Sequence, residues 1–413
     1  MDYYHKYLKY KNKYLQLAGA TKTINISDKT EFQKIITSEI KKLGELFKSY
    51  GEDIRIVGGT VRDILSNNEI NDIDFSTTAN PKKMVSILNE NGIKFYPSGI
   101  EFGTVTVILD GLDYEITSLR KDINTDGRHA EVEYVRDWEI DANRRDLTIN
   151  AMNLDLEGNI GDYFNGIDDL SNSIINFVGS PKDRIEEDFL RILRYFRFHS
   201  RYGDDKYASD VIEAINETKI GMKKLSGERV SMELTKLVKT KNAARELIKM
   251  TELDINEIIG LPKLLNIDEF KRLKSFSDNT LLLIIALLPN NVGKILKSLK
   301  FTNKDIAIGK FIDSNKSKVF SIQDIYLDIY MQHESKQLIQ QELYKNLFEY
   351  QNNTPLLKQI NEMEIKKFPI KGNILIEKGI KGPQIRKKMD ELKLFWINNN
   401  FEISEEDIER ILV

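Results

Sequence analysis

Two aspartates separated by one residue, Asp72 and Asp74, could hold a metal ion. We predict that they lie on one strand, where residues two apart point to the same face and bring both carboxylates side by side. Carboxylates that close repel each other unless a cation lies between them, and Mg²⁺ prefers such oxygen ligands. Glu115, on a later predicted strand, could supply the third carboxylate of a two-metal phosphoryl or nucleotidyl transfer. Taken alone, each residue is also compatible with a solvated surface carboxylate.

A double-glycine turn precedes the two aspartates and could hold a phosphate. The pattern predicts a strand at Ile54–Val57, a turn at Gly58 and Gly59, and a short helix that carries Arg62. Glycines let backbone N–H groups come close to an anion, and the arginine adds a fixed positive charge one turn later. A double glycine alone often makes only a turn. A strand, this turn, a helix and the paired aspartates in that order indicate nucleotide chemistry.

A third polar segment, Arg144-Arg145-Asp146, stands before a predicted helix that Asp146 could cap and that contains Asn150. Arginine can grip a triphosphate, whereas aspartate and asparagine suit a ribose hydroxyl. The plainer alternative is a capped helix at the surface. Because several polar groups stand here between apolar residues, the sequence favours a nucleotide-binding role.

The elements that must position these side chains alternate between strand and helix up to about residue 179. A helical pattern covers 25–50, a helix begins at Pro81 and runs to Asn91, and the polar segment after Leu119 is predicted to be a mobile basic loop, 120–128. Further predicted strands are Lys94–Tyr96, Thr104–Leu109, Asp113–Thr117 and Ile174–Val178. A mixed block of this size indicates a small α/β or α+β sheet domain.

From Ser180 onward the pattern is almost wholly helical, and one predicted helix, 183–201, carries charges on a mostly apolar surface. The charged positions recur every three residues: Asp188, Arg191, Arg194 and Arg197. An aspartate can accept from an exocyclic amine while an arginine donates to a ring nitrogen, which suits cytosine and adenine but not uracil or guanine. Asp188 and Arg191 could therefore select CTP and ATP. Alternatively, Glu187 and Asp188 pair with the arginines in a salt network.

Composition describes an ordinary globular protein. Its 413 residues, 41% hydrophobic and 30% charged, are too many for one compact core. The chain contains no cysteine, which excludes disulfides, zinc–thiolate sites and cysteine nucleophiles. A net charge of −3 limits nucleic-acid binding to local basic patches. No apolar run is long enough to span a bilayer and no secretory or transit signal is evident, so we expect a soluble, cytoplasmic protein that does not bind membranes.

Together these motifs resemble the class II tRNA nucleotidyltransferases, the CCA-adding enzymes, of the poly(A) polymerase/tRNA nucleotidyltransferase family, and especially their eukaryotic and organellar branch. The similar segments are GGTVRD, NDIDFSTTA, YEITSLR, DGRHAEVEYVRDW, RRDLTINAM, EEDFLRILRYFRF and LSGERVSMEL, together with the C-terminal segment that begins FPIKGNIL. The resemblance is dense over residues 51–235 and thin between about 250 and 355. Several independent motifs in the same order make it specific.

The resemblance implies an α+β protein with a polymerase-β-like nucleotidyltransferase head followed by an all-α neck, body and tail. The corresponding segments are an N-terminal extension, 1–25; a catalytic head, 26–179; a neck for base recognition, 180–255; a body, 256–355; and a tRNA-binding tail, 356–413. It also implies that C, C and A are added to the 3′ end of tRNA from CTP and ATP, with Mg²⁺ as cofactor and without a nucleic-acid template.

The same resemblance implies roles for individual residues. Asp72 and Asp74 would bind the metal, with Glu115 as the third catalytic carboxylate. The nucleotide-binding residues would be Gly59 and Arg62 at the triphosphate, Arg145, Asp146 and Asn150 at the sugar and phosphates, and Asp188, Arg191, Arg194 and Arg197 at the base.

Other functions are compatible with these motifs. A poly(A) polymerase, or an enzyme that adds only CC or only A, shares most of the head. The basic segment 120–128 favours full CCA addition, because family members that add only C tend to lack such a loop. A non-catalytic RNA-binding protein on the same scaffold is a different class, and the three intact carboxylates argue against it. The sequence leaves open whether the protein is a monomer or a homodimer.

Overall fold

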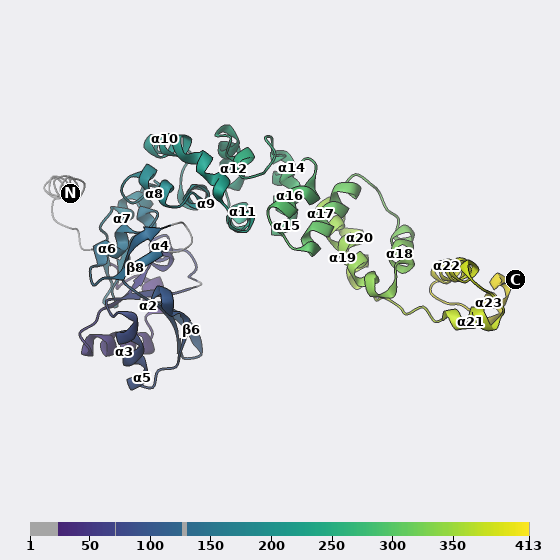
Figure 1. Ribbon diagram of the computed structural model, residues 1–413, viewed down its shortest axis with the longest axis horizontal. Coiled ribbons are helices and arrows are strands. Elements are labelled where there is room, and N and C mark those ends of the chain that lie inside the picture. Colours follow the sequence, from purple (N-terminus) through teal and green to yellow (C-terminus); the bar gives the residue numbers. More distant parts are fainter. Residues whose placement is uncertain (1–23, 71, 126–129, 413) are drawn as a thin grey trace. The chain divides into compact units, whose positions relative to one another are not determined.

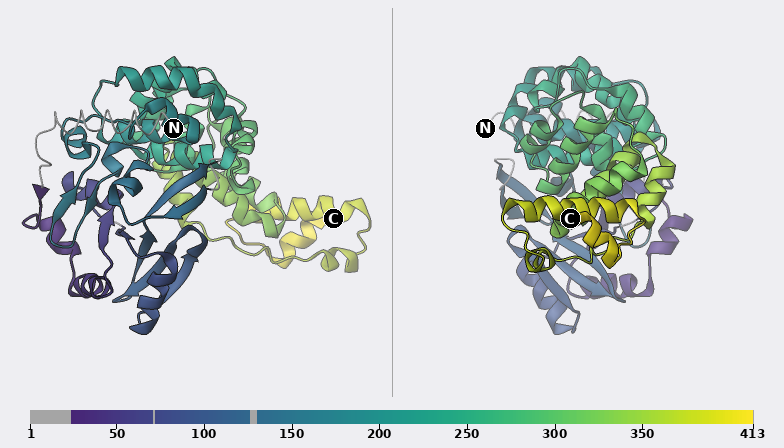
Figure 2. Two further views of the ribbon diagram at one scale, coloured as in Figure 1. Left: turned by 60° about the vertical axis from the view of Figure 1, so that its left-hand side comes forward. Right: turned by 90° about the vertical axis from the view of Figure 1, so that its right-hand side faces the viewer.

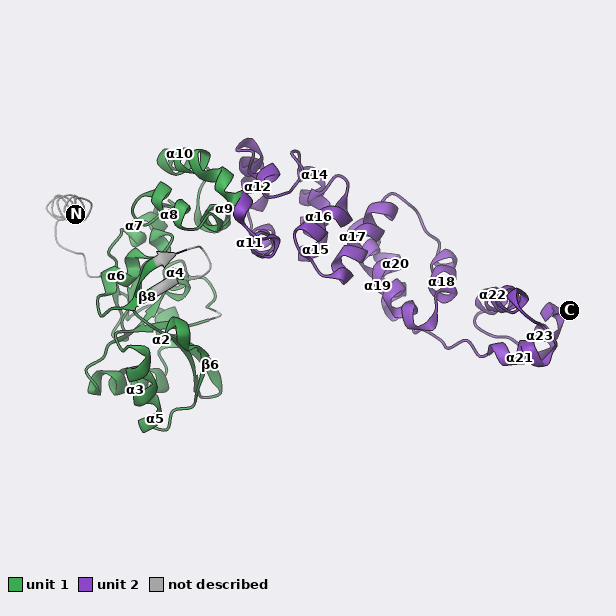
Figure 3. Cartoon of the chain, viewed as in Figure 1, with its two compact units in different colours: residues 1–222 green, residues 223–413 purple. Residues whose placement is uncertain are grey.

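The computed structural model of the chain describes residues 24–70, 72–125 and 130–412 (Figure 1). It divides into two compact units, residues 1–222 and 223–413 (Figure 3). The first unit combines a sheet with helices and contains every residue that the sequence placed in the site. The second unit is helical in its described part, so the predicted α+β class with a helical C-terminal region is confirmed.

An eight-stranded sheet forms the centre of the first unit. Its strands lie in the order β1, β10, β9, β2, β3, β6, β5, β4. Neighbouring strands are antiparallel except β3 and β6, which are parallel. The bounds are β1 Ile24–Asn25, β2 Ile54–Val57, β3 Asp74–Thr77, β4 Phe95–Gly99, β5 Thr104–Leu109, β6 Leu112–Ser118, β9 Asn153–Leu154 and β10 Asn159–Gly161.

Four helices pack against one face of this sheet and enclose the main core of the unit (Figure 2, purple to blue). They are α2 (Thr30–Ile35), α3 (Ser38–Ser49), α4 (Gly59–Leu65) and α5 (Pro81–Glu90). Phe47 and Met84 from these helices meet Phe75 and Ile116 from the sheet. Their burial holds the strands in register, because a slip by one residue would turn the apolar set to the opposite face.

The remaining elements of the first unit are short. They are η1 Ile100–Phe102, β7 Arg120–Thr125, β8 Ala130–Tyr134, α6 Trp138–Asn143, η2 Thr148–Asn150, α7 Gly166–Ser171, α8 Pro181–Glu187, α9 Leu190–Tyr202, α10 Ser209–Thr218 and η3 Lys219–Lys224. Among the strands that the structure describes, β7 and β8 pair only with each other. The predicted loop over 120–128 is therefore wrong for its first part, which is one strand of a β-hairpin; residues 126–129 lie outside the described residues.

Two further predictions differ from the structure. The single helical segment over 25–50 is two helices, because Thr37 interrupts it and caps α3 by accepting a hydrogen bond from the Ile40 N–H at 3.3 Å. The predicted strand Ile174–Val178 is reduced to one bridge between Phe177 and Leu147. The bridge is short because the neighbouring chain turns into η2 directly after Leu147.

Thirteen helices are described in the second unit: α11 Gly227–Lys239, α12 Ala243–Glu252, α13 Ile255–Ile258, α14 Ile267–Lys274, α15 Thr280–Leu287, α16 Val292–Ser298, α17 Asn303–Asn315, α18 Ile322–Met331, α19 Glu334–Gln351, α20 Thr354–Glu362, α21 Gly372–Glu377, α22 Pro383–Asn398 and α23 Glu405–Leu412. Capping boxes begin three of them, at Thr302, Ser321 and Ser404. Within the described residues no single helix is long and apolar enough to cross a membrane; α15 and α16 pass that test only as a pair, and they are bent by 117°.

A small separate core stabilises the end of the second unit. Tyr330 of α18 packs against Trp396 of α22, with ring centroids 5.3 Å apart, and Phe401 lies 5.0 Å from both rings. Leu375 of α21 is also fully buried in this cluster. The last helices are therefore held on α18 by aromatic packing.

Candidate nucleotide-binding site

Two of the three predicted metal-binding carboxylates lie side by side on paired strands. Asp74 is the first residue of β3 and the register partner of Glu115 in β6, so both side chains project from one face of the sheet. Both residues are exposed. Asp72 lies before β3 rather than on it, which corrects the prediction that one strand carries both aspartates. Its carbonyl accepts a hydrogen bond from Thr60 Oγ1 of α4 at 2.9 Å instead of joining the sheet.

These carboxylates repel one another, and the repulsion affects the pKa of Asp74. Although Asp74 is exposed to solvent, the surrounding protein atoms partly desolvate its carboxylate and raise that pKa above its ordinary value. The charges of Glu115 and Asp72 raise it further, and Arg145 opposes the change. A bound cation would relieve the repulsion, and the donors are hard oxygens that suit Mg²⁺. Among the described side chains, no group of three His, Cys, Asp or Glu residues is gathered around a metal position. The part of Asp72 as a ligand therefore stays a prediction.

The predicted glycine turn joins two distant segments of the site. Strand β2 ends at Val57, Gly58 follows with a φ of +67°, and α4 begins at Gly59. This φ lies in the left-handed region that strains residues with a side chain. A Cβ at Gly58 would also lie only 3.2 Å from Arg145 Nη1. The glycine thus lets the Arg145 guanidinium approach the turn.

Arg62 lies behind this turn and is only 5% exposed. Its Nη1 donates to Asn150 Oδ1 at 2.5 Å, and its Nη2 lies 3.1 Å from Asp63 Oδ2. Its guanidinium lies over the rings of Phe198 and Tyr202, 5.0 and 4.8 Å from their centroids. Arg62 thereby connects α4 to α9 and to Asn150, and its direct contact with a triphosphate stays a prediction.

Asp141 is a functional candidate that sequence analysis missed. It lies in α6, is 2% exposed, and accepts hydrogen bonds from Arg144 Nε at 2.8 Å, Arg145 Nη2 at 3.3 Å and the Arg120 N–H at 3.2 Å. Burial opposes its ionisation, but the two arginine charges and these hydrogen bonds hold the pKa of Asp141 below its usual value. A carboxylate three and four residues before two arginines on a helix was the signal that could have revealed it.

Asp146 and Asn150 form a buried polar cluster with Arg194 of α9. Asp146 accepts from Arg194 Nε at 2.6 Å, from Asn150 Nδ2 at 3.2 Å and from the Leu147 N–H at 2.9 Å. Burial opposes the ionisation of Asp146, but the Arg194 charge and these bonds outweigh it and lower its pKa. The predicted helix after Asp146 is only the 3₁₀ turn η2, and Asp146 binds Arg194 instead of capping it.

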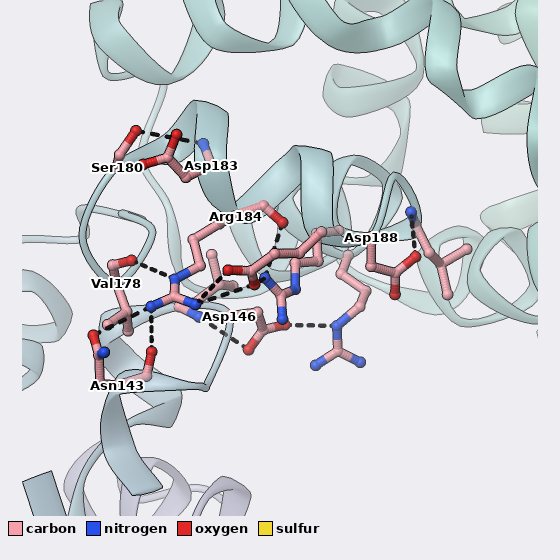
Figure 4. Close-up of polar contacts among 12 residues, drawn as sticks. Asn143, Asp146, Val178, Ser180, Asp183, Arg184 and Asp188 are labelled. Atoms are coloured by element: carbon pink, nitrogen blue, oxygen red, sulfur yellow. Dashed lines mark hydrogen bonds and ion pairs between the residues drawn. The ribbon is translucent and has the colours of Figure 1, made fainter. Parts of the chain in front are cut away.

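The predicted base-reading residues lie at a break between two helices (Figure 4). Sequence analysis predicted one helix over 183–201, but α8 ends at Glu187, Asp188 is extended with φ −155° and ψ 106°, and α9 begins at Leu190. The Asp188 carboxylate accepts from the Leu190 N–H at 3.1 Å, a local bond that competes with a continuous helix. Asp188 therefore lies at a corner and not in the predicted stripe of charges.

Two arginines around this corner bind Glu187. Arg191 Nη1 lies 2.5 Å from Glu187 Oε2 and 2.9 Å from the Arg184 carbonyl oxygen, and Arg184 Nη1 lies 2.9 Å from Glu187 Oε1. Arg184, which sequence analysis did not single out, also donates to the Val178 carbonyl at 2.8 Å and to Asn143 (Figure 4). The salt network considered as an alternative is thus present between Arg191 and Glu187. Both Arg191 bonds use Nη1, and a guanidinium carries further N–H donors on Nε and Nη2.

The last two predicted arginines of this segment point to different partners. Arg194 binds Asp146, as described, and so ties α9 to the segment that follows α6. The Arg197 guanidinium lies 4.2 Å from the centroid of the Phe198 ring. Their role in supporting base recognition stays a prediction.

Comparison with known proteins gives consistent results. Residues 54–176 match the family model of the poly A polymerase head domain. The chain is 36% identical over 394 residues to human CCA tRNA nucleotidyltransferase 1, mitochondrial. The aligned region spans 92% of this chain and 90% of the human protein. It is also 34% identical over 294 residues to a CCA-adding enzyme of Staphylococcus haemolyticus, in an alignment that spans 71% of this chain and 70% of that protein.

A solved structure agrees with these relatives. The Bacillus stearothermophilus CCA-adding enzyme in complex with CTP matches with a TM-score of 0.72 and 26% identity, over 93% of this chain and 97% of the other. The match extends through both the sheet-containing and the helical parts of the chain.

Proposed function

Because this chain belongs to the CCA tRNA nucleotidyltransferase family, we propose that it adds C, C and A to the 3′ end of tRNA from CTP and ATP and releases pyrophosphate, without a nucleic-acid template. One structural observation supports this proposed activity. Asp74 and Glu115 project side by side from paired strands, and the same unit holds the glycine turn that Arg145 approaches.

In the proposed reaction the 3′-hydroxyl oxygen of tRNA attacks the α-phosphate of the nucleotide. The new bond joins that oxygen to the α-phosphorus, and the hydroxyl proton passes to solvent. The bond between the α-phosphorus and the oxygen that bridges it to the β-phosphorus breaks, and pyrophosphate leaves with that oxygen. Asp72, Asp74 and Glu115 would hold Mg²⁺, which when bound would favour ionisation of the attacking hydroxyl and neutralise charge on the departing pyrophosphate. Gly59, Arg62 and Arg145 would hold the triphosphate, and Asp146 with Asn150 would set the position of the sugar.

The base would be selected at the corner between α8 and α9. The Asp188 carboxylate would accept from the exocyclic amine of cytosine or adenine, and Arg191 would donate to the adjacent ring nitrogen. The ion pair with Glu187 would fix the Arg191 side chain while its remaining N–H groups stay available. Uracil and guanine present the reverse pattern and would leave buried polar groups unpaired.

Three finer assignments are also proposals. The chain would begin with an extension of unknown role (1–25) and a catalytic head (26–179). The helical elements from residue 180 onward would then serve as neck (180–255), body (256–355) and tRNA-binding tail (356–413). The basic hairpin residues Arg120 and Lys121 would favour full CCA addition over partial addition. The protein would act in the cytoplasm, although its human relative is a mitochondrial enzyme.

The proposal is tested by incubating the protein with Mg²⁺, a tRNA that lacks its 3′ CCA, and each labelled nucleotide alone and in pairs. We expect three residues to be added from CTP plus ATP and none from UTP or GTP. A long A tail from ATP alone would show a poly(A) polymerase, addition that stops after CC would show a partial enzyme, and no incorporation would favour an RNA-binding protein.

Base selection is tested with Asp188→Ala. We expect the preference for CTP over UTP to fall by about 10- to 100-fold, the range expected for one well-formed polar base contact. Asp183→Ala is a matched control, because Asp183 is an exposed aspartate of the adjacent α8. Unchanged discrimination in Asp188→Ala would rule out its part in base choice.

A further inference from the structure

The sheet face that carries the catalytic carboxylates continues past them to the edge of the sheet. Asp74 is the register partner of Glu115, Glu115 is the partner of Thr106, and Thr106 is the partner of Tyr96. Register partners share a face, so these four side chains form one row across β3, β6, β5 and β4. The alternate residues of these strands belong to the main core on the opposite face: Phe75, Ile116, Tyr114, Val105, Val107 and Phe95.

An aromatic ring and a cation lie at the outer end of this row. Tyr96 is 57% exposed on β4, the edge strand of the sheet. Lys94 lies two residues before Tyr96 and is also exposed. The Lys94 carbonyl accepts a hydrogen bond from the Ile108 N–H at 3.0 Å, so the pairing of β4 with β5 extends to Lys94. Residues two apart share a face. An open aromatic ring beside an ammonium group can stack an unpaired base and bind its phosphate.

Hydroxyl groups line the face between this ring and the carboxylates. Thr104 Oγ1 and Thr117 Oγ1 lie 2.9 Å apart, and Ser98 Oγ lies 2.8 Å from Thr106 Oγ1. A hydroxyl both donates and accepts hydrogen bonds, and it carries no charge that would repel a phosphate backbone. Such a lining suits the ribose hydroxyls of a single RNA strand.

We propose that this face binds the unpaired 3′ end of the RNA acceptor, with a base upstream of the reacting nucleotide stacked on Tyr96. We call it the 3′-strand platform, and it consists of Asp74, Glu115, Thr104, Thr106, Thr117, Tyr96 and Lys94. The inference rests on the proposed function, since the 3′-hydroxyl must reach Asp74 and Glu115. Strands lie about 4.8 Å apart, so three strand steps place Tyr96 about 14 Å from Asp74. The ring is therefore placed to contact a nucleotide before the terminal one.

The test compares Tyr96→Ala with Tyr96→Phe in nucleotide addition to tRNA that lacks its CCA. We expect Tyr96→Ala to raise the KM for tRNA about ten-fold, within the range for loss of one base–aromatic stack, while the KM values for CTP and ATP stay unchanged. Tyr96→Phe retains the ring and should behave as wild type. Tyr163→Ala is the matched control, because Tyr163 is an exposed tyrosine (38%) outside the platform.

A second measurement uses the unaltered protein. A tRNA that carries 2-aminopurine at its first unpaired 3′ position should lose fluorescence on binding, because stacking quenches this base, and Tyr96→Ala should restore the signal. An unquenched base on the wild-type protein, a wild-type KM for tRNA in Tyr96→Ala, or equal increases in KM for tRNA and CTP would each overturn the platform. If the wild-type protein added neither C nor A, the proposed function itself would fail, which is a distinct result.

Discussion

The carboxylates and the arginines of the site are held in opposite ways. Asp74 and Glu115 are exposed on paired strands, and their proximity contributes to the raised pKa of Asp74. Four arginines of the site each have a carboxylate of the chain as partner: Arg145 with Asp141, Arg194 with Asp146, Arg191 with Glu187 and Arg62 with Asp63. The paired strands thus hold two negatively charged side chains close together, where they repel each other. The arginines lie on helices and turns, and each of these four has an acidic side chain within ion-pair distance.

This difference separates two tasks of the site. Backbone pairing prevents the strand carboxylates from moving apart, so a cation is the simplest way to lower their energy. The arginines gain nothing comparable from an incoming triphosphate, because each already has a partner. We therefore expect the carboxylates to provide most of the catalytic effect, and the arginine partners to provide most of the stability.

Asp74→Asn should give the largest effect. The loss of a metal-binding carboxylate should lower the rate of nucleotide addition by roughly 10³-fold or more. The same change should raise the melting temperature of the metal-free protein. The folded-state pKa of Asp74 is raised, so ionised Asp74 costs stability at every pH above its ordinary value, and asparagine removes that cost.

A matched control variant and added metal test whether the effects of Asp74→Asn come from the loss of this particular carboxylate. Asp113→Asn removes an exposed carboxylate from β6, the strand that pairs with β3, and should leave the rate unchanged. Mg²⁺ should raise the melting temperature of the wild type more than that of Asp74→Asn. If Asp74→Asn lost activity and also had a lower melting temperature than the wild type without metal, the ionised Asp74 carboxylate would not be destabilising the folded protein.

Asp141→Asn should give the next largest effect, and chiefly on stability. It leaves Arg144 and Arg145 without their buried counter-charge, which costs about 3 kcal/mol in the free energy of unfolding at pH 7. Urea denaturation measures this change, and Asp183→Asn, at an exposed aspartate, is the control.

The pH dependence of that loss follows from the lowered pKa of Asp141. Its contribution is complete above the unfolded-state value of about 3.9 and is lost as the pH falls through the lower folded-state value. The stabilities of wild type and Asp141→Asn should therefore converge only in that acidic range. A difference that stayed constant down to the lowest pH would show that the asparagine disturbs packing instead.

Tyr202→Phe should give the smallest effect of the three. The Tyr202 hydroxyl donates to Asp63 Oδ1 at 2.5 Å, and burial first of all, opposed by the charge of Arg62, raises its pKa to about 12, so it stays protonated near neutral pH. Phenylalanine removes this hydrogen bond but keeps a ring over Arg62, for a loss of about 1 kcal/mol in unfolding free energy. A loss as large as that in Asp141→Asn would show that the hydroxyl, and not the ring, holds Arg62.

Local patterns were sufficient to predict several elements. The strands Ile54–Val57 and Thr104–Leu109 have the predicted bounds, because a short run of β-branched and apolar residues between turns has few alternatives. The positive φ of Gly58 agrees with the predicted glycine turn. The pairing of Asp74 with Glu115 could not be derived in the same way, because it depends on the parallel register of two strands that are far apart in sequence.

The predictions that failed depend on contacts between side chains and backbone. The three-residue spacing of charges predicted a continuous helix through Asp188, but one carboxylate bond to the Leu190 N–H replaces it with a corner. The spacing of Asp141 to Arg144 and Arg145 indicated only a possible ion pair, and its burial, which gives that pair its importance, is not visible in the sequence. Sequence thus identified most of the candidate residues, and the structure was needed to pair them.

The small aromatic core around Tyr330 has a consequence for recombination between related enzymes. Tyr330 lies in α18, whereas its partners Trp396 and Phe401 lie in the proposed tail, 356–413. A crossover at residue 356 would inherit the two halves of this core from different parents, and their side chains would no longer be matched in volume. A crossover before Ile322 would carry the whole core from one parent. That junction would, however, separate Phe311 and Phe320 from the Tyr344 ring of α19, which lies 5.1 and 5.4 Å from them. A single parent must therefore supply α17 together with everything that follows it.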